Sequence, residues 1–177
     1  MQIIGDLTLP QTITYIGENA FQNCTNLGAI DIPDGVTYIG ELAFRECQSL
    51  ESISIPAGVT KIYKQTFMRC LNLTSVELPD AVTEIGEEAF WYDTALTEIR
   101  IPKNTTTIGT SAFENCSGLT TVYIGSGLKT VSQNAFNWCT GLTDAWYAGT
   151  EENWSTVSVG SGNSTLLNVL HYAGENE

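Results

Sequence analysis

Basic residues are scarce in this chain of 177 residues. Only 7 lysines and arginines stand against 20 aspartates and glutamates, which gives a formal net charge of -13 at pH 7. Phosphate backbones are bound by clustered Lys and Arg side chains, and this composition does not supply them. We therefore expect no nucleic acid among the partners of this protein.

Long apolar runs are also lacking. No stretch reaches the about 18 consecutive apolar residues of a transmembrane helix, so we expect no direct insertion into a membrane. The opening residues MQIIGDLTLP lack the basic region and the apolar core of a signal peptide. Because Leu7, Leu9 and Pro10 already match the middle of a repeat described below, we expect the chain to begin inside a longer array.

Signatures of catalysis are few. The single histidine, His171, falls in a predicted terminal strand, where a structural role is favoured. The GSGN stretch at 160–163 predicts a turn, because no strand and helix flank it as in a phosphate-binding loop. Adjacent carboxylates fall in predicted surface turns, where they solvate an acidic protein: Glu87 with Glu88, and Glu151 with Glu152. Without a nucleophile, a base and a group to orient it, we expect no enzyme and no cofactor.

What the sequence has in abundance is repetition. Phenylalanine, leucine and proline each recur every 23 residues in a fixed phase. The three series are Phe21, Phe44, Phe67, Phe90, Phe113 and Phe136; Leu27, Leu50, Leu73, Leu96, Leu119 and Leu142; and Pro10, Pro33, Pro56, Pro79 and Pro102, with Gly125 in the next place. This recurrence predicts six copies of one structural unit.

One such unit is LTSVELPDAVTEIGEEAFWYDTA, residues 73–95. Val76 and Leu78 alternate with polar residues, which predicts a short strand with one buried face. The following proline ends the strand, and Pro-x-Gly, as at 33–35, predicts a tight turn. The VTxIG segment predicts a second extended piece. The AFxxC segment is too short for an independent helix and predicts one helical or 3₁₀ turn.

A single unit cannot bury its apolar residues, whereas stacked units place identical positions about 4.8 Å apart. The sequence therefore predicts a mostly β solenoid of six 23-residue coils, with short one-turn helical or 3₁₀ segments. The predicted inward set of one coil is Leu27, Ile30, Ile32, Val36, Ile39, Ala43, Phe44 and Cys47.

The cysteines belong to the same inward series. They recur at one place in the repeat, and Asp93 interrupts them. Buried free thiols are the favoured interpretation, because the position is inward and five is an odd number; one disulfide between adjacent coils is the alternative. A zinc site would need ligands that converge from several directions, so we expect no metal. The series is Cys24, Cys47, Cys70, Cys116 and Cys139.

Two outward rows of the predicted strands differ in chemistry along the array. The first changes from small and acidic residues to an arginine and two aromatics: Asp31, Ser54, Glu77, Arg100, Tyr123 and Trp146. The second stays small or polar: Ala29, Ser52, Ser75, Glu98, Thr121 and Asp144. Tyr, Trp and Arg are enriched at binding hot spots, so we predict a ligand-binding face at Arg100, Tyr123 and Trp146, with Glu77 and Glu98 at its rim.

Alternatives to this binding face remain open. Trp146 could pack under the C-terminal segment, and Tyr123 could simply cover the edge of the sheet. A second set of aromatic residues, also expected to be exposed, lies beside the AF turns, where packing between coils is favoured over binding: Trp91, Tyr92 and Trp138.

The combined frame IPxxVTxIGxxAFxxCxxL, visible from Leu7 to about Tyr147, resembles the BspA-like leucine-rich repeat family of bacterial and protist surface proteins. The resemblance implies a leucine-rich-repeat solenoid over residues 1–147. From Ala148 the period breaks, and the motifs GT…W, GSGN and HY are similar to closing modules of the same family. We therefore expect residues 148–177 to form a C-terminal cap within the same structural domain. No matching N-terminal cap is visible, so the first coil is expected to be frayed or covered by other sequence.

The apolar face expected in this cap consists of Trp154, Val157, Val159, Leu166, Val169 and Leu170. For function, the resemblance implies a non-enzymatic adhesion or interaction module of a cell-surface or secreted protein. Its expected partner is a host matrix protein, a cell-surface protein or a glycan. The alternative is a passive spacer within a larger surface protein.

Overall fold

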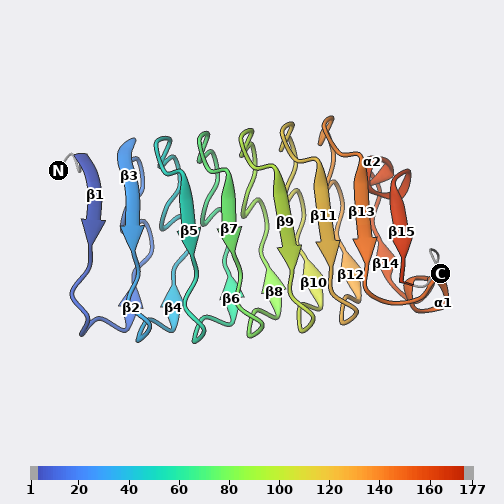
Figure 1. Cartoon of the computed structure of the whole chain (residues 1–177), viewed down its shortest axis with the longest axis horizontal. Coiled ribbons are helices and arrows are strands. Elements are labelled where there is room, and N and C mark those ends of the chain that lie inside the picture. The colour runs from blue at the N-terminus through green and yellow to red at the C-terminus, as the bar shows by residue number, and fades with distance from the viewer. Residues whose placement is uncertain (1–3, 174–177) are drawn as a thin grey trace.

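The computed structural model describes residues 4–173 and shows a parallel β-solenoid. Successive coils lie side by side along the long axis, with the two ends of the chain at opposite ends of the array (Figure 1). Each coil contributes one longer strand to one row and one two-residue strand to a second row. The predicted solenoid is thus confirmed.

The longer strands pair in parallel at the repeat spacing. Val122, for example, lies between Ile99 of the preceding coil and Ala145 of the following coil. The row consists of β1 (Ile4–Thr8), β3 (Asn26–Asp31), β5 (Ser52–Ser54), β7 (Ser75–Glu77), β9 (Glu98–Ile101), β11 (Thr121–Ile124), β13 (Asp144–Tyr147) and β15 (Leu170–Tyr172). Strands β9, β11, β13 and β15 form one continuous sheet.

The short strands form the second row, where the VTxIG segments were predicted to be extended. They are β2 (Tyr15–Ile16), β4 (Tyr38–Ile39), β6 (Lys61–Ile62), β8 (Glu84–Ile85), β10 (Thr107–Ile108), β12 (Thr130–Val131) and β14 (Ser158–Val159). Between the two rows the chain makes the predicted tight turn, in which the Val36 N–H donates to the Pro33 carbonyl oxygen at 3.0 Å.

The AF segment closes each coil with turns that also bond to the next coil. Within a coil, the Trp91 N–H donates to Glu88 O at 3.1 Å, which is the i to i−3 pattern of a 3₁₀ turn. The Phe90 N–H instead donates to Ala112 O of the following coil, at 2.8 Å. A continuous helix cannot form, because two positions per coil have a left-handed backbone. These are Asn19, Leu42, Gln65, Glu88, Ser111 and Asn134, and Asn23, Glu46, Arg69, Tyr92, Asn115 and Trp138.

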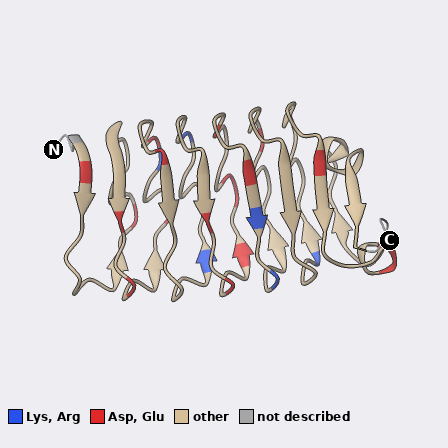
Figure 2. Cartoon of the chain, in the orientation of Figure 1, with Lys and Arg blue, Asp and Glu red and all other residues tan. Residues whose placement is uncertain are grey.

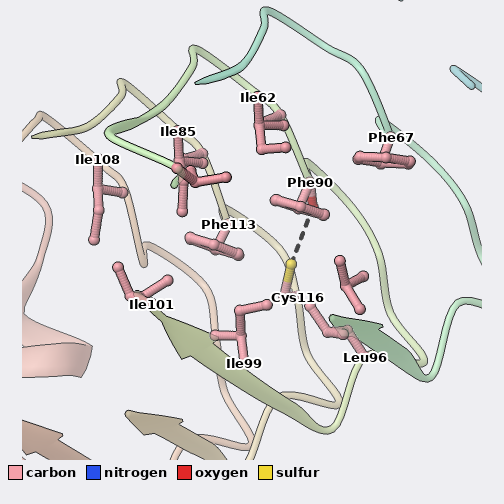
Figure 3. Close-up of a cluster of buried hydrophobic side chains, with 14 of the residues drawn as sticks. Ile62, Phe67, Ile85, Phe90, Leu96, Ile99, Ile101, Ile108, Phe113 and Cys116 are labelled. Atoms are coloured by element: carbon pink, nitrogen blue, oxygen red, sulfur yellow. Dashed lines mark hydrogen bonds between the residues drawn. The ribbon is translucent and has the colours of Figure 1, made fainter. Parts of the chain in front are cut away.

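Stacked phenylalanines run through the core. From Phe21 to Phe136, adjacent rings have centroids 5.1 to 5.4 Å apart and interplanar angles of 2 to 14°. Figure 3 shows Phe67, Phe90 and Phe113 of this series among the surrounding isoleucines. The inward set predicted for one coil, from Leu27 to Cys47, is buried throughout.

The cysteines are free thiols, as predicted, and all but the half-buried Cys24 are buried. Four of them donate to a phenylalanine carbonyl oxygen of the preceding coil; the Cys116 Sγ, for example, lies 3.1 Å from Phe90 O (Figure 3). Burial raises the pKa of Cys47 and of Cys139 to about 12. These thiols therefore stay protonated, and they act as small core residues.

Asp93 occupies the one cysteine position that the series lacks. It is fully buried, and its Oδ1 accepts a hydrogen bond from the Cys70 N–H at 2.8 Å, while its Oδ2 has no partner. Burial raises the pKa of this carboxyl well above its ordinary value. The folded state thus binds the proton more tightly than the unfolded state, so the carboxyl destabilises the fold progressively as the pH rises through the raised pKa.

We predict that Asp93→Cys raises the free energy of unfolding, by about 1–3 kcal/mol at pH 8 and by less at pH 4, because the substitution removes a buried unpaired carboxyl oxygen. Denaturant unfolding at both pH values measures this difference. Asp93→Asn is the control that keeps the shape without the ionisation, and its stability should depend less on pH than that of the wild type. A gain that is equal at both pH values would contradict the role assigned to ionisation.

The two ends of the array differ. In the first coil, Phe21 and Ile13 are only partly buried, whereas the equivalent residues of the inner coils are buried. At the other end, residues 148–173 fold over the last coil through two short helices, α1 (Glu151–Trp154) and α2 (Ser164–Leu167), and strands β14 and β15. Trp154, Val157 and Leu166 are buried there.

None of the helices in residues 4–173 is long and apolar enough to cross a membrane.

Asn163 terminates the ladder of hydrogen bonds between coils. Its Oδ1 accepts from the Phe136 N–H at 3.0 Å, in place of the backbone carbonyl that a further coil would supply. Its Nδ2 donates to Ser132 O at 2.8 Å and to Gly160 O at 2.9 Å. Asn163, which is 2% exposed, thus provides hydrogen-bond partners for backbone groups at the end of the array.

We predict that Asn163→Ala lowers the free energy of unfolding by about 2–3 kcal/mol, because it leaves the buried Phe136 N–H without a partner and removes the shorter of the two hydrogen bonds to the Ser132 carbonyl. Thermal and urea unfolding provide the measurement. Asn168→Ala, at an exposed position of the same segment, is the matched control and should change stability by less than about 0.5 kcal/mol. Equal effects of the two substitutions would show that Asn163 does not close the ladder.

Candidate binding face

The predicted face lies on the four-stranded sheet formed by β9, β11, β13 and β15. Parallel pairing places Arg100, Tyr123, Trp146 and His171 at successive positions of one outward row. Figure 2 shows an acidic and a basic segment on β9 and no basic segment on β11 or β13. Arg100 therefore lies at one end of a row of aromatic side chains.

Arg100 lies directly over the next aromatic ring. Its guanidinium carbon is 3.9 Å from the Tyr123 ring centroid, within the range of a cation–π contact. Glu98 holds the same guanidinium from within the strand, with Oε1 2.8 Å from an Arg100 Nη atom. These two contacts fix the direction of the guanidinium. The group is still open to solvent, because 66% of the Arg100 side chain is exposed.

The other end of the row is held by the C-terminal segment. The Trp146 indole stacks on the His171 imidazole with ring centroids 4.3 Å apart, and His171 Nε2 lies 3.5 Å from Asp144 Oδ1. Trp146 is half-buried against this segment, which agrees in part with the alternative that it packs under the C-terminal segment. It nevertheless reaches the surface, where it lines a hollow together with Arg100 and Tyr123.

This hollow is open to solvent and has a volume of about 480 Å³. It lies where the outward row meets the turns that follow the strands. The row of turn prolines ends there at Gly125, where the backbone lies so close to the preceding coil that a Cβ atom would meet the Lys103 Cα at 2.4 Å. The lining residues are Asp80, Arg100, Ile101, Pro102, Lys103, Tyr123, Ile124, Gly125, Trp146, Tyr147, Ala148 and Ala173.

A second cation stands at the hollow. Lys103 Nζ lies 2.8 Å from Asp80 Oδ2, and this hydrogen bond raises the pKa of the lysine. Two of the 7 basic residues of the chain, Arg100 and Lys103, therefore line one hollow beside two aromatic rings. Each cation is paired with a carboxylate that a ligand would have to replace or bridge.

The residues predicted for this face are thus brought together to different degrees. Arg100, Tyr123 and Trp146 line one hollow, and Glu98 is joined to them through Arg100. Glu77 lies exposed on β7, outside the lining. Sequence reasoning missed Asp80 and Lys103, although both occupy the residue that follows the turn proline, 23 residues apart. That spacing was the signal by which the pair could have been found.

The aromatic set beside the AF turns reaches the surface, as expected: Tyr92 is 39% and Trp138 is 62% exposed. Packing between coils was favoured over binding for this set, and Tyr92 does contact Arg69 of the preceding coil, whose guanidinium carbon lies 5.4 Å from the ring centroid. Tyr92 and Trp138 both occupy the second left-handed position of their coils, whose equivalents are mostly polar, and this position faces solvent. Trp91 is half-buried and contacts Tyr92 with ring centroids 5.1 Å apart.

The carboxylates considered for catalysis have structural partners or lie at the surface. Glu87 pairs with Lys64 at 2.8 Å, Glu88 accepts a hydrogen bond from Gln65, and the Glu151–Glu152 pair occupies the first turn of α1. Among residues 4–173 no group of three or more His, Cys, Asp and Glu side chains is arranged to hold a metal ion.

Comparison with known proteins identifies the repeat. Residues 14–143 match the family model of the BspA type leucine rich repeat region, in 6 copies. No curated protein matches the chain in sequence.

Solved structures of bacterial repeat proteins share the fold. A leucine rich repeat protein of T. pallidum is 26% identical, with a TM-score of 0.79 over 88% of this chain and 72% of that chain. A leucine-rich repeat protein of Eubacterium ventriosum is 23% identical with a TM-score of 0.76; this chain is covered to 93%, but that chain only to 42%. A leucine rich cell surface protein of Faecalibacterium prausnitzii is 21% identical, with a TM-score of 0.56 over 88% of this chain and 62% of that chain.

Proposed function

The chain belongs to the BspA-type leucine-rich repeat family, and on that premise we propose that it is a non-enzymatic module that binds a protein or a glycan outside the cell. The observation that carries the proposal is the outward row of Arg100, Tyr123 and Trp146 at a hollow of about 480 Å³. The stacking of the coils does not require apolar residues in this outward row, yet the row holds three residue types that dominate binding hot spots.

The chemistry of the row suits two kinds of ligand. The Tyr123 and Trp146 rings offer flat faces on which a sugar ring or an apolar side chain can stack. Arg100 and Lys103 offer hydrogen-bond donors to a carboxylate or a hydroxyl group at the same place. Glu77 and Glu98 would form an acidic rim that disfavours a second acidic surface beyond the hollow.

We place this module at the cell surface or in a secreted protein, with a host matrix protein, a cell-surface protein or a glycan as its partner. Support comes from the family and from the cell-surface description of the F. prausnitzii protein, which shares the fold.

The second candidate is a passive spacer that separates other parts of a surface protein. The polar stretch Ser52, Ser54 and Ser75 of the same strand face favours it, because such a face offers no hot-spot residues. The two functions are separated by whether the aromatic half of the face binds anything that the serine half does not.

We predict that the triple variant Arg100→Ala, Tyr123→Ala, Trp146→Ala weakens ligand binding at least about 30-fold, or about 2 kcal/mol, because it removes the hot-spot residues of the hollow. Wild type and variant are screened against matrix proteins and a glycan array, and affinities are measured for each ligand found. Circular dichroism confirms that the variant keeps the fold.

The matched control is the triple variant Ser52→Ala, Ser54→Ala, Ser75→Ala on the same strand face, which should bind as the wild type does. Binding that survives the loss of Arg100, Tyr123 and Trp146 would place the site elsewhere. A wild type that binds no component of either screen would favour the spacer.

A further inference from the structure

A second hollow lies beside the AF turns, between two exposed aromatic residues. Its volume is about 230 Å³, and it shares no lining residue with the hollow on the strand face. The lining consists of two rows of three residues at the repeat spacing: Tyr92, Asn115 and Trp138, and Thr94, Ser117 and Thr140.

The two aromatic residues occupy backbone positions that suit other side chains better. Tyr92 has φ 65° and Trp138 has φ 58°, in the left-handed region where bulky residues are outliers. Two equivalent positions hold asparagine, Asn23 and Asn115, which tolerates this conformation. With 39% and 62% of their surfaces exposed, the rings gain little from packing to offset the strain. Strain of this kind at an exposed aromatic residue points to a role in binding.

The spacing of the two rings fits one flat ring between them. Backbone hydrogen bonds tie Tyr92 to the next coil and Asn115 to the coil after it, so Tyr92 and Trp138 are two coils apart. At about 4.8 Å per coil, their backbones are separated by about 10 Å. Two stacking contacts of about 4.5–5 Å each fill that distance. The shorter Asn115 leaves the space between the aromatics open.

The Tyr92 ring is already held in place. The Arg69 guanidinium, at the equivalent position of the preceding coil, lies 5.4 Å from its centroid, and the Trp91 ring contacts it at 5.1 Å. The same ring lines the hollow together with Asn115 and Trp138. A ligand that stacks there meets an oriented ring and loses less conformational entropy on binding.

The polar residues of the hollow are available to a ligand. The side chains of Thr94, Asn115, Ser117 and Thr140 form no hydrogen bond with any residue in 4–173, whereas the Thr74 and Thr120 hydroxyls donate to backbone carbonyls of the preceding coil. Three hydroxyls and one amide supply both donors and acceptors, and no charged residue lines the hollow. This lining matches an uncharged ring that carries hydroxyl groups.

We propose that the Tyr92–Trp138 hollow is a saccharide subsite that binds one neutral pyranose unit of a glycan. The pyranose ring stacks between the Tyr92 and Trp138 rings, and its hydroxyls bond to Asn115, Ser117 and the two threonines. The subsite stands apart from the strand face and does not depend on the function proposed for Arg100, Tyr123 and Trp146.

The test uses the full chain and a panel of neutral methyl pyranosides, of gluco, galacto and manno configuration, with their short oligomers. Saturation-transfer NMR detects binding, and tryptophan fluorescence titration gives the affinity. We expect at least one configuration to bind, and Tyr92→Asn or Trp138→Asn to weaken it at least about 10-fold. Both substitutions introduce the residue that the equivalent positions tolerate, so the fold is preserved.

Two controls make the result specific. Tyr15→Asn removes an aromatic residue that is 59% exposed elsewhere on the array, and it should leave binding unchanged. The variant lacking Arg100, Tyr123 and Trp146 should also bind as the wild type does. Absence of binding by every pyranoside, or binding by the Asn variants equal to that of the wild type, would each overturn the proposal.

Discussion

Hydrogen bonding from each coil to the next at a constant offset is the constraint on which the rest of this structure depends. Within the repeats, parallel pairing in both strand rows and the Phe90-type bonds of the AF turns place each residue above its equivalent 23 positions away. An inward position must therefore suit the same neighbours in every coil. The stacked phenylalanines and the thiols that donate to phenylalanine carbonyls are the side chains that meet this condition.

The same constraint explains the exceptions. A polar residue can enter an inward row where the adjacent coil offers a partner, as when Thr105 Oγ1 donates to Val82 O at 2.8 Å. Asp93 occupies an inward position with one carboxyl oxygen unpaired, so the stability of the fold depends on whether this carboxyl is protonated. At the C-terminal end of the ladder, the Asn163 side-chain oxygen takes the place of the backbone carbonyl that a further coil would supply.

Periodicity in the sequence was sufficient to predict the solenoid, its inward residues and the row shared by Arg100, Tyr123 and Trp146. The left-handed positions were not predicted, because residues such as Leu42, Arg69 and Tyr92 rarely adopt a left-handed backbone. The exposure of Tyr92 and Trp138 was expected, but the left-handed backbone beneath them was not. The ion pair of Lys103 with Asp80 joins the proline turns of two adjacent coils, and it was missed because only the strand rows were compared from coil to coil.

The central claim is that stacking fixes the inward residues and leaves the outward ones free for binding. Phe90 and Tyr92, two residues apart in one coil, test it most directly through urea unfolding of Phe90→Ala and Tyr92→Asn. The account predicts that Phe90→Ala lowers the free energy of unfolding by about 3–5 kcal/mol, while Tyr92→Asn leaves it unchanged or raises it by up to about 1 kcal/mol. A loss for Tyr92→Asn as large as that for Phe90→Ala would contradict the account.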